Sequence, residues 1–180
     1  TAHMFKYVSG PPPRPTGAVN MIRPDGTQPA PMGFTGEAIN IPMVGGAVVA
    51  AYNVEGVDSL VLTPKVLSGI FDGTIKKWND TQIADLNSGV TLPDATIAQF
   101  HRSDGSGTTD NFTKYLTAAA PKVWKLSNAK EWKAEGGQGA KGNDGVAAAI
   151  KSTDNAIGYV ELSFAQDAEL KVAKVDNGGG

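Results

Sequence analysis

Residues 102–109 read RSDGSGTT and combine the chemical groups that bind a small oxyanion. Arg102 can present a planar fork of N–H donors to two oxygens at once. Hydroxyl side chains that can donate hydrogen bonds follow it, at Ser106, Thr108 and Thr109. Glycines let the backbone approach a ligand closely, at Gly105 and Gly107. We therefore predict a site for a small tetrahedral anion in this segment.

The elements on either side of this segment place the site where anions bind in α/β proteins. The pattern predicts a strand over residues 96–102 and a helix over residues 106–119. The first N–H groups of a helix lack internal partners, and the helix dipole is positive there. In an open α/β sheet, ligands bind outside the carboxyl ends of the strands.

A purely structural alternative exists for the same residues. Ser106 or Thr108 would only cap the helix, and Arg102 would pair with Asp104 or Asp110. The density of these residue types at one strand-to-helix junction favours the anion site over this alternative.

The rest of the chain alternates between strand-like and helix-like patterns. Apolar β-type runs predict strands over residues 41–52, 156–162 and 170–175. Helical spacing predicts helices over residues 64–72, 81–86, 145–151 and 164–168, the third of these capped by Asn143 and Asp144. Residues 136–142 are predicted to be a glycine-rich loop. This order predicts an α/β fold with a mixed, mostly parallel sheet flanked by helices.

The composition changes near residue 38. Seven prolines interspersed with glycines fall within residues 11–31, and proline removes backbone donors. We expect residues 1–38 to form an extended arm with one hairpin, including a short strand at 18–22. Residues 39–176 would form the α/β lobe, and residues 177–180 a tail.

Composition excludes several classes of function. The net charge of −2 argues against a broad basic face for nucleic acid or anionic lipid. The longest apolar run, residues 41–52, is too short to span a bilayer. The chain has no cysteine and its two histidines are far apart, so no metal site or other cofactor is expected. The first residues lack a basic segment followed by an apolar one, so no signal peptide is expected in this sequence.

No catalytic motif is recognisable, so we expect no enzyme activity. Ser106, His101 and Asp104 do not have the spacing of a nucleophile elbow, and the three lie along one strand and turn. His101 precedes Arg102 on a strand, so the two side chains should point to opposite faces. The glycine-rich residues 136–142 are not a nucleotide P-loop, because Gly142 stands where that motif needs Ser or Thr. The three tryptophans are expected to pack in or around the core.

Four ordered motifs carry a family resemblance. They are residues 67–80 (LSGIFDGTIKKWND), 102–108 (RSDGSGT), 139–147 (GAKGNDGVA) and 156–161 (AIGYVE). Together they resemble the periplasmic phosphate-binding proteins that feed high-affinity phosphate ABC transporters, the PstS family. The resemblance runs from about residue 41 to residue 175.

This resemblance implies specific roles. Arg102, Ser106, Gly107 and Thr108 match phosphate contacts, and Asp104 matches the residue that orients the arginine. Supporting positions would be Gly105 and Thr109. The resemblance also implies one lobe of a type II periplasmic-binding-protein fold. It implies a non-catalytic role in phosphate uptake, a periplasmic or extracellular location, and an ABC transporter permease as partner.

Family members have two lobes, and this sequence resembles only the second. The first lobe brings an aspartate that accepts the proton of hydrogen phosphate and so rejects sulfate. No segment here matches that lobe, which leaves Asp25 or Glu37 in the arm as candidate replacements. A second chain could complete the cleft. The alternative function is an interaction or structural module derived from a phosphate-binding lobe, assembling through its arm or exposed cleft.

Overall fold

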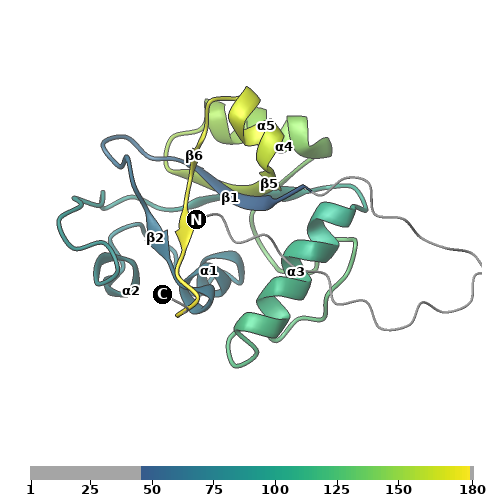
Figure 1. Cartoon of the computed structure of the whole chain (residues 1–180), viewed down its shortest axis with the longest axis horizontal. Coiled ribbons are helices and arrows are strands. Elements are labelled where there is room, and N and C mark those ends of the chain that lie inside the picture. Colours follow the sequence, from purple (N-terminus) through teal and green to yellow (C-terminus); the bar gives the residue numbers. More distant parts are fainter. Residues whose placement is uncertain (1–45, 179–180) are drawn as a thin grey trace, which may run out of the picture. The chain divides into compact units, whose positions relative to one another are not determined.

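The computed structural model describes residues 46–178, which form a five-stranded sheet and a separate two-stranded sheet, with helices on both faces of the larger one (Figure 1). The strands are β1 (Val48–Asn53), β2 (Val61–Leu62), β3 (Ala98–Arg102), β4 (Gln138–Ala140), β5 (Ala156–Glu161), β6 (Lys171–Val172) and β7 (Lys174–Val175). The helices are α1 (Pro64–Phe71), α2 (Thr81–Ala84), α3 (Gly107–Ala119), α4 (Gly142–Ser152) and α5 (Leu162–Asp167). The predicted arm, its hairpin and its strand lie outside the described residues.

The larger sheet has the order β4-β3-β5-β1-β6. Strand β3 pairs in parallel with both β4 and β5, whereas β1 pairs antiparallel with both β5 and β6. Four of these five strands therefore share one direction, and β1 alone runs against them. The prediction of a mixed, mostly parallel sheet flanked by helices is confirmed.

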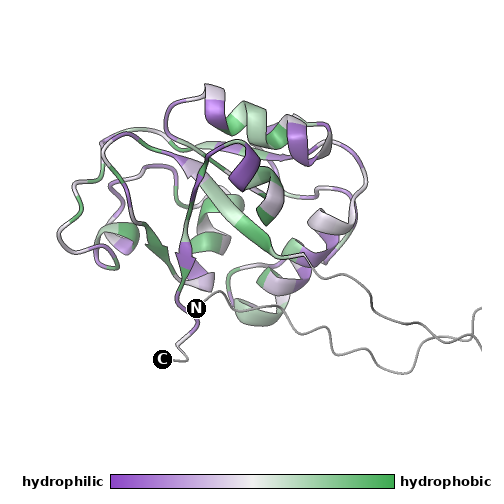
Figure 2. Cartoon of the chain, turned by 45° about the horizontal axis from the view of Figure 1, so that its top comes forward, coloured by the Kyte–Doolittle hydropathy of each residue, from purple (hydrophilic) through white to green (hydrophobic). Residues whose placement is uncertain are grey.

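Alternation along the central strands builds a core on each face of the sheet. Tyr52 on β1 and Tyr159 on β5 belong to one buried cluster, which includes residues of α1 and α3. Ala51 and Val160, their alternate neighbours, belong to a second cluster with residues of α4 and α5. Figure 1 shows α4 and α5 above the sheet and α1 and α3 below it. Figure 2 shows hydrophobic residues along the central strands and hydrophilic ones alternating along the covering helices.

Two sequence predictions about the sheet were wrong. Residues 136–142 are not only a loop, because β4 lies within them and pairs with β3. The predicted single strand over residues 170–175 is divided at Ala173 into β6, which pairs with β1, and β7, which pairs with β2. In both cases, the pairing partner decides the element, and a partner distant in sequence leaves no local signal.

Gly158 allows α4 to pack closely on the sheet. A Cβ atom placed there would lie 2.7 Å from Ile150 Cδ1 and 2.9 Å from the backbone oxygen of Phe100. The glycine in the predicted AIGYVE strand is thus explained by packing between β3, β5 and α4. Of the helices within residues 46–178, none has the length and hydrophobicity needed to cross a membrane.

Candidate functional site

The candidate site lies at the edge of the sheet where two neighbouring parallel strands end. Strand β3 ends at Arg102 and is followed by α3, while β4 ends at Ala140 and is followed by α4. Arg102 and Ala140 are register partners. The amino ends of both helices therefore lie near each other, at the edge where α/β proteins bind ligands.

Asp104 joins the two strand ends through its carboxylate. It accepts hydrogen bonds from Arg102 Nε at 2.7 Å and from Arg102 Nη2 at 2.5 Å. It also accepts the backbone N–H of Gly142, the first residue of α4, at 3.1 Å. The hydrogen bonds from Arg102 and then from Gly142 hold the pKa of Asp104 well below its usual value. The carboxylate is therefore charged and fixed at neutral pH.

The Arg102 guanidinium is held by one edge and presents the other to α3. Its side chain is only 10% exposed. With Nε and Nη2 occupied by Asp104, Nη1 lies 3.5 Å from the Thr108 hydroxyl in the first turn of α3. The hydrogen bonds to Asp104 raise the arginine's pKa above its ordinary value, so this group stays cationic.

The first turn of α3 is only partly capped. The Ser106 hydroxyl accepts the N–H of Thr109 at 3.0 Å and donates to the Thr109 hydroxyl at 2.8 Å. The N–H groups of Gly107 and Thr108 have no hydrogen-bond partner within residues 46–178. A Cβ atom added at Gly107 would meet nothing within 4 Å. Two donors at the positive end of the helix therefore remain available beside Arg102.

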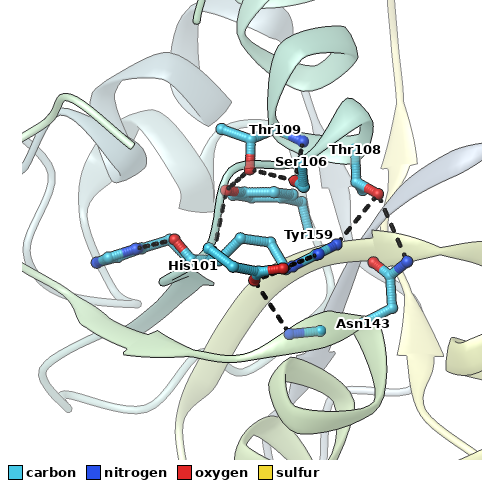
Figure 3. Close-up of polar contacts among 9 residues, drawn as sticks. His101, Ser106, Thr108, Thr109, Asn143 and Tyr159 are labelled. Carbon is cyan, nitrogen blue, oxygen red and sulfur yellow. Dashed lines mark hydrogen bonds and ion pairs between the residues drawn. The ribbon is translucent and has the colours of Figure 1, made fainter. Parts of the chain in front are cut away.

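Thr109, in contrast, turns its hydroxyl into the protein. Its side-chain oxygen lies 2.7 Å from the hydroxyl of Tyr159, and the residue is fully buried. Figure 3 shows the Thr109 hydroxyl directed to Tyr159 and Ser106 rather than towards Thr108. Thr109 thus supports the turn and does not offer a donor at its surface.

Asn143 brings α4 into the same site. Its Nδ2 lies 3.5 Å from the Thr108 hydroxyl, and its Oδ1 is buried without a hydrogen-bond partner among the described residues (Figure 3). The prediction that Asn143 and Asp144 cap this helix was wrong. Helix α4 begins at Gly142, and its N-cap Lys141 makes no side-chain cap. The Gly142 amide is instead satisfied by Asp104, a residue remote in sequence.

His101 lies apart from these groups. Its ring stacks on Trp132 at 5.1 Å between centroids, and Figure 3 shows it pointing away from Thr108 and Asn143. The only hydrogen-bond partner of the ring within the described chain is the Arg102 carbonyl. Together, Ser106, His101 and Asp104 do not form a hydrolytic triad. The tryptophans pack in or against the core as predicted, and residues 46–178 contain no group of three or more acidic or histidine side chains suited to a metal ion.

The structure thus brings together the predicted residues Arg102, Asp104, Ser106, Gly107 and Thr108. Both elements of the structural alternative, the Ser106 cap and the Arg102–Asp104 pair, are also present. They occupy one amide of α3 and one edge of the guanidinium. Arg102 Nη1 remains directed to the Thr108 hydroxyl, and the Gly107 and Thr108 amides have no partner within residues 46–178.

Two residues at the site were not among the predicted site residues: Asn143 and Tyr159. Both fall in motifs quoted from the sequence, at 139–147 and 156–161. Asn143 lies next to Thr108 because β4 pairs with β3, and Tyr159 lies behind Arg102 because β5 pairs with β3. A prediction of these two residues would have required both pairings to be known.

Comparison with known proteins gives consistent results. Residues 24–180 match the PBP superfamily domain. The chain is 46% identical over 139 residues to phosphate-binding protein PstS 3 of Mycobacterium leprae, covering 77% of this chain and 38% of that protein. It is 42% identical over 148 residues to phosphate-binding protein PstS of Pasteurella multocida, covering 80% of this chain and 43% of that protein.

A solved structure shares the fold. The high-affinity periplasmic phosphate-binding protein PfluDING, bound with phosphate, matches with a TM-score of 0.61 and 28% identity, covering 75% of this chain and 38% of that one. The chain therefore spans about two-fifths of the length of these relatives.

Proposed function

This chain belongs to the PBP superfamily, and from that premise we propose that it binds inorganic phosphate, without catalysis, as part of the solute-binding component of a phosphate uptake system. Its relatives of the PstS family are named for phosphate binding. The chain matches only about two-fifths of the length of these relatives, which we take to be one lobe. We therefore propose, on the basis of this one lobe, the function of a complete two-lobe protein.

The orientation of Arg102 carries the proposal. Asp104 holds the Nε edge of the guanidinium, which directs Nη1 to the first turn of α3. There, the amides of Gly107 and Thr108 have no partner among the described residues. A fixed cation and free N–H groups at a helix amino end form a favourable environment for a small oxyanion.

Each residue of the site has a proposed role. Arg102 contributes charge and two-oxygen geometry, while Gly107 and Thr108 contribute amides. The Thr108 hydroxyl, which accepts from Arg102 and Asn143, donates its proton to the anion, and the Ser106 hydroxyl donates once it rotates away from Thr109. Asp104 orients the arginine, and Gly105 and Thr109 shape the turn.

The remaining contacts on phosphate would come from outside residues 46–178. A first-lobe segment or a second chain would close over the anion, and an ABC transporter permease would receive it. The location would be periplasmic or extracellular. We further propose that residues 1–38 form an arm, residues 39–176 the lobe and residues 177–180 a tail. Asp25 and Glu37, in the arm, lie outside the described residues and are candidates for the proton-accepting carboxylate.

Titration of the chain with phosphate, followed by amide NMR at constant ionic strength, tests the proposal. The amide signals of Gly107 and Thr108 should move in a saturable way. Arg102→Ala should weaken binding by about 10- to 100-fold, because it removes hydrogen bonds to a charged ligand worth roughly 1.5–3 kcal/mol.

Lys77→Ala is the matched control. It also removes one positive charge, but Lys77 is exposed and pairs with Asp94 away from the site. This variant should bind phosphate as the parent chain does. Equal losses in both variants, or no saturable shift in the parent chain, would refute a specific site.

A further inference from the structure

Tyr159 connects the strand that carries Arg102 with the helix that carries the open amides. Its hydroxyl accepts the backbone N–H of Arg102 at 3.2 Å and lies 2.7 Å from the Thr109 hydroxyl (Figure 3). The residue is fully buried. One hydroxyl group therefore bridges the end of β3 and the first turn of α3.

The aromatic ring is held firmly in this position. It stacks on Phe112 of α3, with 4.4 Å between centroids and an interplanar angle of 14°. The edge of Phe71 from α1 lies against it at 6.0 Å. Burial raises the pKa of Tyr159, so its hydroxyl keeps its proton at neutral pH.

The hydroxyl protons around Tyr159 must be shared among three oxygens. Ser106 donates its only hydroxyl proton to the Thr109 oxygen, and Thr109 in turn contacts Tyr159. If Ser106 donates its hydrogen bond to an oxyanion instead, the Thr109 oxygen loses this hydrogen-bond donor. Either Thr109 or Tyr159 can be the donor of their shared hydrogen bond, so Tyr159 can supply the replacement.

This exchange matters because Thr109 is fully buried. A buried oxygen that loses its donor is costly, so without Tyr159 the Ser106 proton would be held by Thr109. With Tyr159 in place, the Thr109 oxygen keeps a donor when Ser106 turns to the anion, and Thr109 can then donate its own proton to the Ser106 oxygen.

We propose that Tyr159 is a positioning residue of the anion site, which holds the backbone of Arg102 against α3 and releases the Ser106 hydroxyl for the ligand. This inference rests on the proposed binding of phosphate. Tyr159, a core residue of β5, would thus raise the affinity for the anion without contacting it.

Tyr159→Phe tests the inference, with Tyr52→Phe as its control. Tyr52 is also a fully buried tyrosine facing the same core cluster, but its hydroxyl has no hydrogen-bond partner among the described residues. Tyr159→Phe should weaken phosphate binding by about fivefold, as expected for one neutral hydrogen bond. Tyr52→Phe should bind phosphate as the parent chain does.

A second readout separates positioning from general destabilisation. Without phosphate, the Arg102 amide should shift upfield and exchange faster with solvent in Tyr159→Phe, and remain unchanged in Tyr52→Phe. Thr109→Val removes the same hydroxyl contact from the other side. It breaks the same bridge but also removes the oxygen that holds the Ser106 proton, so it should weaken phosphate binding less than Tyr159→Phe does, and the double variant should lose less than the product of the two effects. If Tyr159→Phe does not fold, Thr109→Val provides the test.

The outcomes distinguish this inference from the function on which it depends. If the parent chain shows no saturable response to phosphate, the proposed function fails and the inference fails with it. If the parent chain responds and Tyr159→Phe responds equally, only the inference fails. An Arg102 amide unaffected by Tyr159→Phe, or full additivity with Thr109→Val, would also overturn it.

Discussion

At the scale of single residues, the central feature is that the N–H donors of the Arg102 guanidinium have two different partners. The edge formed by Nε and Nη2 is bound by Asp104, and Nη1 faces Thr108. A nearby carboxylate reduces the net charge of the site, which weakens its long-range attraction for anions. In exchange, it fixes the direction of the guanidinium, so that less side-chain entropy is lost on binding.

The charge state of Asp104 predicts a pH dependence of stability. The pKa of Asp104 is lowered in the folded state, from an ordinary value of 3.8, mainly by hydrogen bonds from Arg102. A carboxylate with a lowered pKa contributes stability above the unfolded pKa, and this is lost as the pH falls through the folded pKa. The free energy of unfolding of the parent chain should exceed that of Asp104→Asn at neutral pH, and the difference should shrink below the ordinary carboxyl pKa.

Urea unfolding of both proteins from neutral pH down to strongly acidic pH measures this difference. Asp94→Asn is the control, because Asp94 makes an exposed pair with Lys77. Exposed pairs contribute little, so its difference from the parent chain should be smaller than that of Asp104→Asn at neutral pH. A parent–Asp104→Asn difference that does not change as the pH falls would contradict the role of the carboxylate charge.

At the scale of elements, the site depends on two strand-to-helix junctions lying side by side. Strands β3 and β4 pair in parallel, so α3 and α4 begin at the same edge. Helix α4 packs on the sheet at Gly158, where a side chain would collide with Ile150 and with the backbone of Phe100. The position of α4, and with it that of Asn143, follows from this close contact.

Gly158→Ala should therefore destabilise the protein by about 1–3 kcal/mol, as expected for overpacking in a core. The backbone oxygen at 2.9 Å cannot move away as a flexible side chain would. Gly145→Ala is the control within α4, because a Cβ there would make only ordinary contacts, at 3.7 Å and beyond. That variant should be neutral or more stable by up to about 1 kcal/mol, since alanine favours helix. Thermal or urea unfolding measures both, and equal stability of the two variants would contradict the packing argument.

At the scale of the whole described part, one sheet covered on both faces makes a single folding unit. Tyr52 and Ala51 are adjacent on β1 and belong to opposite core clusters. The proposed anion site is built from α3, which contributes to the first cluster, and from β3 and α4, which contribute to the second. This is the arrangement of one lobe of a periplasmic-binding protein, as the sequence predicted and the relatives support.

Phosphate should therefore stabilise the whole unit through linkage. At a free concentration ten times the dissociation constant, it should add about 1.4 kcal/mol to the free energy of unfolding. Unfolding in phosphate and in chloride at equal ionic strength measures the effect. In Arg102→Ala, the free energy of unfolding should differ between phosphate and chloride only by the general salt effect, which does not depend on a binding site. The same gain in that variant would indicate a general salt effect in place of a site.

The fold class and the central residues of the candidate site could be predicted from the sequence because their signals are local. Apolar spacing marked α1 and β5, and Ser106 marked the start of α3. The run from Arg102 to Thr109 places a cation, hydroxyls and a helix amino end within eight residues. Such proximity along the chain almost determines proximity in space.

Only the tertiary structure decided which strands pair and which residues distant in the chain form hydrogen bonds. Strand β4 exists because β3 lies beside it, and α4 begins at Gly142 because the carboxylate of Asp104 accepts its amide. Tyr159 lies behind Arg102 because β5 pairs with β3. The first of these hydrogen bonds spans 38 positions of the chain, and the second spans 57. Hydrogen bonds across such separations leave no periodicity in the sequence, since their energy depends on a geometry that exists only once the sheet is assembled.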